Sequence, residues 1–378
     1  MKAVYIHIPF CVQKCRYCDF VSFSCADDIK RRYVDCLIKE IELAGEMYAG
    51  DEVSTVFIGG GTPSTLPYGE FARVMKALRR AFDLSKTNEL TIECNPGTVD
   101  EKKLAEYNSC GINRLSFGLQ SANDGLLREL SRIHTYGDFL KSLELARRAG
   151  FTNINADIMY ALPNQGLSDL EETLCAALEQ NLTHISAYSL IVEEGTPLYN
   201  DVESGKVKLP DEDSAFDMHR FVVEYLKKRG YIRYEISNYA KSGFECRHNL
   251  CYWDCGEYIG FGLNSHSAVM RDGIWTRYSN TADLREYETM TECGKLPVKH
   301  TERIEGIDAM NEFLMLGLRK TNGISLEEFE KRFKCNLFSV YGKRISDLSD
   351  SLKCENGRLY MTERGLDIQN MILCDLLL

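Results

Sequence analysis

Apolar and polar positions alternate through the first part of the chain in a repeated order of strand and helix. Short apolar runs with the character of buried strands lie at 4–8, 54–58, 90–94, 114–118, 152–158 and 184–190. Segments with apolar residues at helical spacing follow them at 29–43, 68–82, 101–108, 136–149 and 167–180. Such repetition predicts a parallel sheet with helices on its outside. Six units are fewer than the eight of a closed barrel, so we expect a partial (β/α)6 TIM-like barrel.

The regular alternation ends near Asn238, and we expect a domain boundary there. The last segments before it read as a polar connection, a helix and a strand, at 193–213, 214–228 and 231–236. Near the end of the chain, helical patterns surround a hairpin-like Asn356-Gly357, at 307–319, 326–333, 340–352 and 363–375. The predicted fold class is therefore α/β, with the barrel at 1–237 and a smaller α+β, winged-helix-like domain at 238–378.

Composition and charge narrow the class of protein. The chain has 378 residues, 44% hydrophobic and 10% aromatic, which is typical of a globular protein with one large and one smaller domain. A net charge of −11 gives no electrostatic support to nucleic-acid binding. The start of the chain lacks the pattern of a signal peptide, and no run reaches the roughly 18 apolar residues of a membrane span. Fifteen cysteines in this setting favour a reduced, cytoplasmic protein.

Three cysteines follow the first predicted strand at C-x3-C-x2-C spacing: Cys11, Cys15 and Cys18. Thiolates this close together on one loop are typical ligands of an iron–sulfur cluster. A cubane cluster takes four ligands, so three cysteines leave one iron for a ligand from outside the protein. Zinc sites are usually built from paired units such as C-x2-C, but a structural zinc ion is the alternative, with a fourth ligand from His7, Asp19 or Cys25.

The cysteine loop closely resembles that of the radical SAM superfamily, in which an aromatic residue precedes the third cysteine, as Tyr17 does here. The resemblance implies that Cys11, Cys15 and Cys18 hold a [4Fe–4S] cluster, with S-adenosylmethionine (SAM) at the fourth iron. It also implies a (β/α)6 core and reductive cleavage of SAM, for which an electron donor such as flavodoxin or ferredoxin is an expected partner.

Candidate ligand-binding residues lie where predicted strands end, which is where barrels place functional groups. The turn Gly59-Gly60-Gly61-Thr62-Pro63 lets the backbone approach a ligand, although a tight turn would also explain it. Glu93 and Asp157 are acids after apolar strands, Gln120 offers an amide and Arg132 offers a fork for a carboxylate. Capping or salt bridges are the structural alternatives. The GGGTP form resembles the HemN-like branch of the superfamily, which implies SAM contacts from Tyr5, Tyr17, Gly60, Gly61, Thr62, Glu93, Gln120, Arg132 and Asp157.

A second motif, His248-Asn249-Leu250-Cys251-Tyr252-Trp253, places a histidine among aromatic residues. A histidine beside flat aromatic walls can ligate a haem iron, and a structural histidine packed on aromatic rings is the alternative. H-N-x-x-Y-W resembles the haem-binding motif of haem chaperones in the HemN-like branch, which implies that His248 binds haem. The competing candidate axial ligands are the thiols of Cys251 and Cys255, and His266 is a third candidate for which the sequence favours a structural role.

The resemblance covers nearly the whole chain and leaves two functions to compare. Coproporphyrinogen III oxidases of this branch have a fourth cysteine two residues after the third, where this chain has Phe20, and they carry an N-terminal extension. Both differences favour a haem chaperone and make oxidase activity doubtful. The expected partners are haem and an acceptor haemoprotein, with a membrane-associated respiratory protein as one candidate and a second copy of the chain as another partner.

Two alternatives stay open at this point. One is the oxidase itself, which would decarboxylate coproporphyrinogen III to protoporphyrinogen IX. The other is a radical SAM enzyme that acts on an unrelated substrate, with His248 serving a purely structural role. That enzyme would bind no haem, so haem binding separates it from the chaperone.

Overall fold

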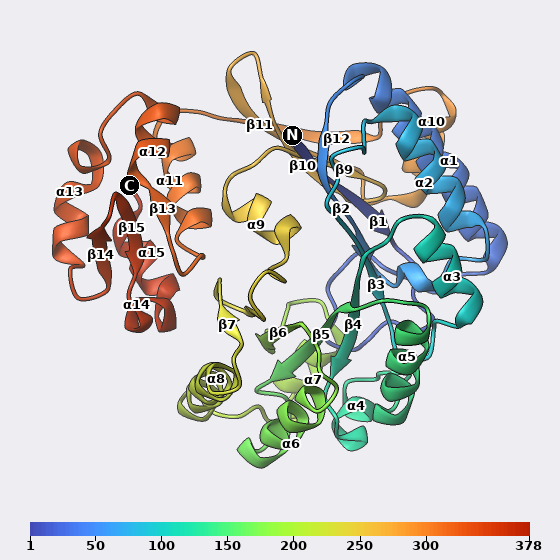
Figure 1. Ribbon diagram of the computed structural model, residues 1–378, viewed down its shortest axis with the longest axis horizontal. Helices are drawn as coiled ribbons and strands as arrows, with labels where there is room; N and C mark the ends of the chain where they lie inside the picture. The colour runs from blue at the N-terminus through green and yellow to red at the C-terminus, as the bar shows by residue number, and fades with distance from the viewer.

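Fifteen strands of the computed structural model, which describes residues 1–378, form two sheets. Neighbouring strands in the middle of the larger sheet are parallel. They lie side by side in chain order: β1 (Lys2–Ile8), β2 (Val53–Gly60), β3 (Glu89–Cys94), β4 (Arg114–Gln120), β5 (Asn153–Tyr160) and β6 (His184–Ser189). The predicted partial barrel of six strand–helix units is therefore confirmed (Figure 1).

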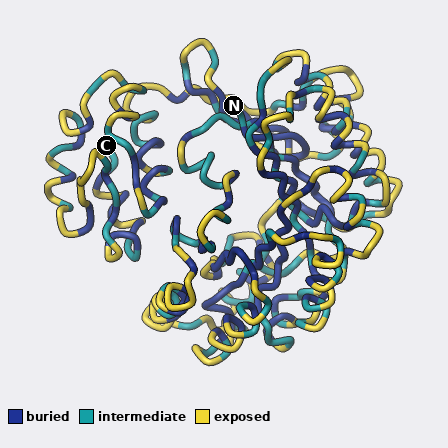
Figure 2. The backbone as a smooth tube through the Cα atoms, viewed as in Figure 1, coloured by how far each residue is buried: buried dark blue, intermediate teal, exposed yellow.

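Along the chain, helices alternate with these strands, and in space they cover the outside of the barrel (Figure 1). They are α1 (Asp27–Met47), the 3-10 turn η1 (Pro63–Thr65), α2 (Glu70–Ala81), α3 (Glu101–Ser109), α4 (Asp124–Glu129), α5 (Tyr136–Arg148) and α6 (Leu167–Leu178). Helix α1 buries a stripe with Tyr33, Leu37 and Ile41 at four-residue spacing. Strand β4 is buried along its whole length, as expected of a parallel strand covered on both faces. The core of 58 residues follows these buried strands (Figure 2).

The sheet continues beyond the barrel on both sides. Strand β9 (Tyr258–Phe261) pairs in parallel with β1, and antiparallel strands follow it as β10 (His266–Arg271), β11 (Ile274–Asn280) and β12 (Val298–Ile304). Beyond β6 lie the short antiparallel strands β8 (Asn238–Ala240) and β7 (Ile232–Arg233). The other helices here are α7 (Pro197–Glu203), α8 (Glu212–Lys227), α9 (Arg247–Trp253) and α10 (Leu284–Glu292).

The C-terminal segment packs around a hydrophobic core of 16 buried residues, of which Cys255 alone lies outside the segment. It consists of α11 (Gly306–Gly317), β13 (Ile324–Ser325), α12 (Leu326–Phe333), α13 (Leu337–Asp347), β14 (Leu352–Glu355), β15 (Arg358–Met361), α14 (Glu363–Asp367) and α15 (Gln369–Leu376). Asn356 and Gly357 turn the β14–β15 hairpin with positive φ angles of 51° and 73°, as their residue types predict. The domain boundary at 237 stays a prediction. Because the main sheet runs through residue 304, we propose that the separate module begins near Gly306.

Two segments before that module differ from the expected pattern. The polar connection at 193–213 contains helix α7, because Thr196 accepts a hydrogen bond from the Tyr199 N–H and Pro197 suits the first helical position. The strand expected at 231–236 shortens to the two residues of β7.

Two helices inside the C-terminal module also differ from expectation. The helix expected at 340–352 ends at Asp347, and Leu352 instead begins strand β14. The helix expected at 363–375 is divided at Ile368, whose φ of −119° lies outside the helical range. The periodicity therefore identified these helices but not their ends.

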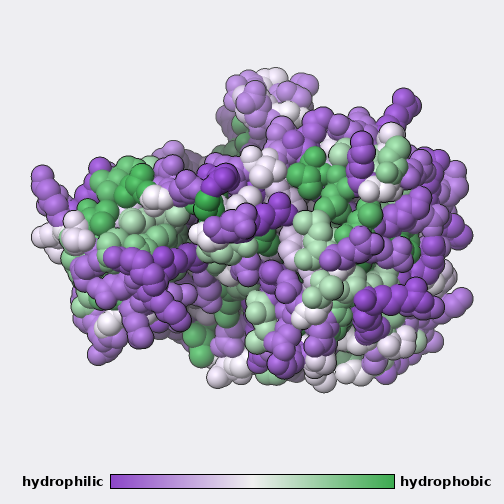
Figure 3. Space-filling model, turned by 90° about the horizontal axis from the view of Figure 1, so that it is seen from above, coloured by the Kyte–Doolittle hydropathy of each residue, from purple (hydrophilic) through white to green (hydrophobic).

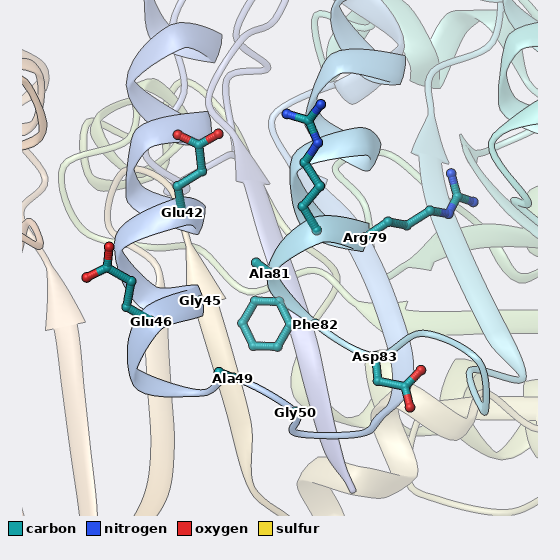
Figure 4. A pocket seen from close by; sticks show the side chains of 10 residues that line it. Glu42, Gly45, Glu46, Ala49, Gly50, Arg79, Ala81, Phe82 and Asp83 are labelled. Carbon is teal, nitrogen blue, oxygen red and sulfur yellow. The ribbon is translucent and has the colours of Figure 1, made fainter.

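An open surface hollow lies away from the strand ends that a barrel uses for ligands. Polar residues cover much of the face in Figure 3, and no helix combines the length and apolar character that crossing a membrane requires. The hollow lies between the C-terminal ends of α1 and α2, with charged walls such as Glu46 and Arg79 (Figure 4). A Cβ on Gly45 would lie 2.7 Å from the Ala81 Cβ, so this glycine allows the two helices to approach closely.

Glu40 fastens helix α1 to the strands that extend the barrel. Its buried carboxylate accepts hydrogen bonds from Gly262 N (2.9 Å), Asn280 Nδ2 (2.6 Å) and the Tyr287 hydroxyl (2.5 Å). Burial raises the pKa of Glu40 to about 7, although these donors favour the ionised form. One side chain thus joins the first helix to segments far along the chain.

Replacing Glu40 by alanine is expected to lower the free energy of unfolding by about 3 kcal/mol, because three buried donors lose their acceptor. Urea unfolding at pH 8, followed by circular dichroism, measures the change. Glu42→Ala, at an exposed position of the same helix, is the matched control and should change stability by less than about 0.5 kcal/mol. Equal stability of the two variants would contradict the fastening role.

Candidate functional site

The cysteine loop connects the carboxyl end of β1 to the start of α1. Cys11, Cys15 and Cys18 are free, half-buried thiols on this loop. Two barrel side chains point donors at them: Thr62 Oγ1 lies 3.6 Å from the Cys11 Sγ, and Arg132 Nη1 lies 3.5 Å from the Cys15 Sγ. Donors that face sulfur stabilise a thiolate, which is the form that ligates metal.

The three cysteine sulfurs of the loop are suitable ligands for an iron–sulfur cluster. No three histidine, cysteine, aspartate or glutamate side chains in the structure are arranged around a single metal ion. A cubane cluster binds each thiolate to a different iron, so its cysteines are spread more widely than the ligands of one ion. Three thiols with the nearby Arg132 and Thr62 donors therefore fit a [4Fe–4S] cluster.

The glycine turn at the end of β2 packs so tightly against neighbouring residues that it leaves no room for side chains. Gly60 has a φ of +109°, and a Cβ there would lie 2.5 Å from the His7 ring. A Cβ on Gly61 would lie 2.8 Å from the Phe10 carbonyl oxygen. The Gly60 N–H donates to Glu93 Oε2 at 3.1 Å. The turn therefore needs glycine at both positions, and it brings the backbone to the Glu93 carboxyl.

Arg132 is tied into a network that sequence reasoning described only in part. Its Nη2 donates to Asn95 Oδ1 (2.8 Å) and to the Gly118 carbonyl oxygen (2.7 Å), while Asn95 Nδ2 donates to Thr62 Oγ1 (2.8 Å). Asn95 was not among the predicted site residues, although its place two residues after Glu93 at a strand end is the signal that identifies it. The Arg132 Nε is buried without an acceptor. Such an orphaned donor fits a ligand carboxylate.

The two acids predicted at strand ends lie in the same enclosed region. Burial, followed by the neighbouring Asp157, raises the pKa of Glu93 to about 8. Burial also raises the pKa of Asp157, although Asn155 Nδ2 donates to its Oδ1 at 2.8 Å. Burial outweighs the opposing effect of Arg114 on both acids, and enclosed carboxyl groups of this kind fit a ligand that brings hydroxyl or ammonium donors.

The remaining predicted residues surround this region at different depths. The Tyr5 hydroxyl lies 3.0 Å from His7 Nδ1. Gln120 has a positive φ of 66° at an irregularity in the β4–β5 ladder and is almost fully buried. Tyr17 packs against a small apolar cluster that includes Leu126. These positions place all three around the strand ends, but none makes a contact that fixes its role.

His248 lies in the interior of the barrel, where both of its ring nitrogens have hydrogen-bond partners. It is 1% exposed, its Nδ1 lies 2.9 Å from Thr55 Oγ1, and its Nε2 lies 2.8 Å from the Tyr252 hydroxyl. Its ring stacks on Phe57 with centroids 5.2 Å apart. Burial, and then Arg114, lower the pKa of His248 to about 3, so the ring is neutral. The motif histidine thus holds helix α9 against β2.

An aromatic cavity of about 690 Å³ opens beside the cysteine loop. It lies between β1, the loop, helix α9, strands β9–β11 and helix α11. Its aromatic walls come from Tyr5, Phe20, Tyr252, Trp253, Tyr258 and Trp275. The volume is that of a ligand site, and flat aromatic walls suit a planar ligand.

The ligand-free protein should lose stability as pH rises, because of Glu93. Between the unfolded pKa of 4.5 and the folded pKa of about 8, folded Glu93 keeps a proton that the unfolded chain has released. Folding then becomes less favourable by up to about 1.4 kcal/mol per pH unit. Urea unfolding from pH 5.5 to 7.5 should show a shallower decline for Glu93→Gln than for wild type. The exposed variant Glu101→Gln is the control, and a Glu93→Gln slope equal to the control's would contradict the assignment.

His248→Ala is expected to destabilise the ligand-free protein by about 2–4 kcal/mol, because it opens a cavity and leaves Thr55 and Tyr252 without their partner. Thermal unfolding of the ligand-free chain measures this loss. Arg247→Ala removes an exposed side chain from the same helix and should change stability by less than about 0.5 kcal/mol. Wild-type stability in His248→Ala would mean that the histidine has no structural role.

Comparisons with known proteins place these features in a family. A model of the radical SAM superfamily matches residues 5–175, and a model of the HemN C-terminal domain matches residues 304–368. The solved structure of coproporphyrinogen III oxidase (HemN) from Escherichia coli has the same fold, with a TM-score of 0.85 at 22% identity over 99% of this chain and 89% of that chain.

Curated relatives give a closer match in sequence. The protein "Heme chaperone HemW" of Lactococcus lactis is 34% identical over 98% of this chain and 96% of its own length. Its namesake in Bacillus subtilis is 34% identical over 98% of both chains. The Escherichia coli namesake is 38% identical over 75% of each. With this identity over nearly its whole length, the chain belongs to the HemW family of the radical SAM superfamily.

Proposed function

We propose that this protein is a haem chaperone, which binds haem and passes it to an acceptor haemoprotein. The observation that carries the proposal is 34% identity over 98% of the chain to proteins named as haem chaperones. The aromatic cavity beside the cysteine loop supports it. Phe20 favours the chaperone over the oxidase, because it occupies the position of the oxidase's fourth cysteine and is a 61% exposed wall of that cavity.

We further propose that Cys11, Cys15 and Cys18 hold a [4Fe–4S] cluster next to SAM. When bound, this pair supplies one-electron reductive chemistry. The chain's own contribution is to hold the loop in place: Thr62 and Arg132 face two of the sulfurs, and both belong to the network that runs along the strand ends. Thr62 and Arg132 would therefore help to position both the cysteine loop and SAM.

The SAM site is proposed along the carboxyl ends of β1 to β5. Arg132 offers its unpartnered Nε–H to the carboxylate of the methionine moiety. Glu93 beside the Gly60 N–H accepts from the amino group, and Asp157 accepts from ribose hydroxyls. The remaining contacts are proposed from Tyr5, Tyr17, Gly61, Thr62 and Gln120.

Haem is proposed to occupy the aromatic cavity. Of the ligands that the sequence offers, Cys255 and His266 line it, and His248 reaches it only through its hydrogen bond to Tyr252. Further proposals follow from the family resemblance: a flavodoxin or ferredoxin as electron donor, a membrane-associated respiratory acceptor, a homodimer and a cytoplasmic location.

The cluster proposal predicts a loss of iron in Cys15→Ser. Anaerobic reconstitution of wild type should give about four irons per chain, whereas the variant should lose most of them. Iron analysis and the visible absorbance of the cluster measure this. Cys25→Ser, a half-buried thiol outside the C-x3-C-x2-C triple, is the matched control and should retain the cluster. Zinc in place of iron, or equal iron in both variants, would refute the assignment.

Haem titration of the reconstituted wild-type protein tests the function as a whole. Saturable binding with a shifted Soret band is expected, followed by transfer of haem to an apo-haemoprotein. The same sample, supplied with SAM and a reductant, should not convert coproporphyrinogen III. Turnover of that substrate, or the absence of saturable haem binding, would contradict the chaperone function and favour a radical SAM enzyme instead.

A further inference from the structure

The aromatic cavity contains two histidines, and only one has a free ring. His7 lines the cavity, but its Nδ1 accepts from the Tyr5 hydroxyl (3.0 Å) and its Nε2 donates to the Val21 carbonyl oxygen (3.0 Å). His248 is buried and bonded at both nitrogens. His266 lines the cavity from an exposed position, and neither of its ring nitrogens has a hydrogen-bond partner. Iron ligation by His266 would therefore break no existing interaction.

The strand register directs His266 into the cavity. In the β10–β11 ladder, His266 pairs with Ser279, Ala268 pairs with Arg277 and Met270 pairs with Trp275. Alternate residues of a strand share a face, and directly paired residues of neighbouring strands lie on the same face. Four members of this face line the cavity: His266, Ala268, Trp275 and Arg277. The histidine thus shares one face of the sheet with Arg277, its diagonal neighbour, and with Trp275 farther along the strands.

The nearby thiols are poorer ligands in this structure. Burial raises the pKa of Cys255 to about 12 and that of Cys251 to about 11. Ligation by either thiol therefore requires the loss of a proton from a buried group. Cys255 lines the cavity, but its Sγ is directed at the Glu312 carbonyl oxygen (4.0 Å), and Cys251 is not among the lining residues. A neutral imidazole needs no such deprotonation.

The two tryptophan walls are held from behind by the C-terminal module. The Arg319 guanidinium lies 4.4 Å from the Trp253 ring centroid, and the Arg332 guanidinium lies 4.8 Å from that of Trp275. The Trp253 Nε1 is buried without a partner. Arg277, which lines the cavity, pairs with Glu312 at 2.5 Å and with Glu302 at 3.6 Å, and it is the basic side chain that an acidic ligand edge would meet. These features match a planar, amphipathic ligand with carboxylates at one edge.

We propose that His266 ligates the haem iron, and that His248 is a positioning residue that holds the Tyr252 wall. This inference rests on the proposed haem-binding function and names the ligand within it. Tyr252 connects His248 to the cavity wall. Its hydroxyl is hydrogen-bonded to His248 Nε2, and its ring packs edge-on against Tyr258 at a centroid distance of 4.6 Å. Haem would then lie between the H-N-x-x-Y-W helix and the face of β10 and β11.

Ferric haem titration of three alanine variants tests the assignment. His266→Ala should weaken haem binding at least about tenfold and change the Soret band and the electron paramagnetic resonance spectrum of any bound haem. Added imidazole should restore the wild-type spectrum, because it supplies the missing ring. His300→Ala removes an exposed histidine on β12 outside the cavity and is the matched control.

His248→Ala separates ligation from positioning. It should lower haem affinity through the loosened wall, yet at saturating haem it should show the wild-type axial-ligand spectrum. The inference is overturned if His266→Ala binds haem with wild-type affinity and spectrum, or if His248→Ala alone loses the histidine signature. Circular dichroism checks the fold, and His266→Gln replaces His266→Ala if the alanine variant does not fold. If wild type binds no haem at all, the proposed function itself fails, which is a distinct result.

Discussion

Strand β1 is hydrogen-bonded along both edges, to β2 inside the barrel and to β9 in the extension, and both candidate sites depend on this ladder. Its carboxyl end releases the cysteine loop at a defined place next to the glycine turn of β2. The pairing with β9 brings residues 258–277 to the other side of the same loop. The cluster region and the aromatic cavity are therefore neighbours because one strand is shared between them.

Polar groups inside the barrel are bound in pairs and networks, which a low-dielectric interior requires. Helix α9 fills part of this interior, and the Glu89 carboxylate accepts from the Arg247 and His248 N–H groups at 2.9 and 3.0 Å. An acid at a helix N-terminus is favourable because it meets free N–H groups. At the strand ends, the Arg132 Nε is left without an acceptor, and burial raises the pKa of Glu93 although the Gly60 N–H donates to its carboxyl group.

The cysteine loop belongs to both sites. Its cysteines face Thr62 and Arg132, while Phe20 is part of the cavity wall. The oxidase fold is shared almost completely, so fold alone does not separate a chaperone from an oxidase. The curated relatives named as haem chaperones favour that function, and the exposed Phe20 ring is the local feature where the loop meets the cavity. The cysteine triple and the aromatic cavity are therefore joined by a single loop.

The sequence by itself determined the (β/α)6 order, the cysteine loop and the acids at strand ends, because buried strands, helical periodicity and close cysteine spacing are local signals. It did not identify Asn95, whose role comes from contacts with Thr62 and Arg132 across three chain segments. It also singled out His248 from a short motif, whereas the tertiary structure buries that ring between Thr55 and Tyr252. Only the pairing of β10 with β11 decided that His266 faces the cavity, because which side chains share a face depends on strand register. Local pattern specifies elements, and long-range packing decides which side chains meet.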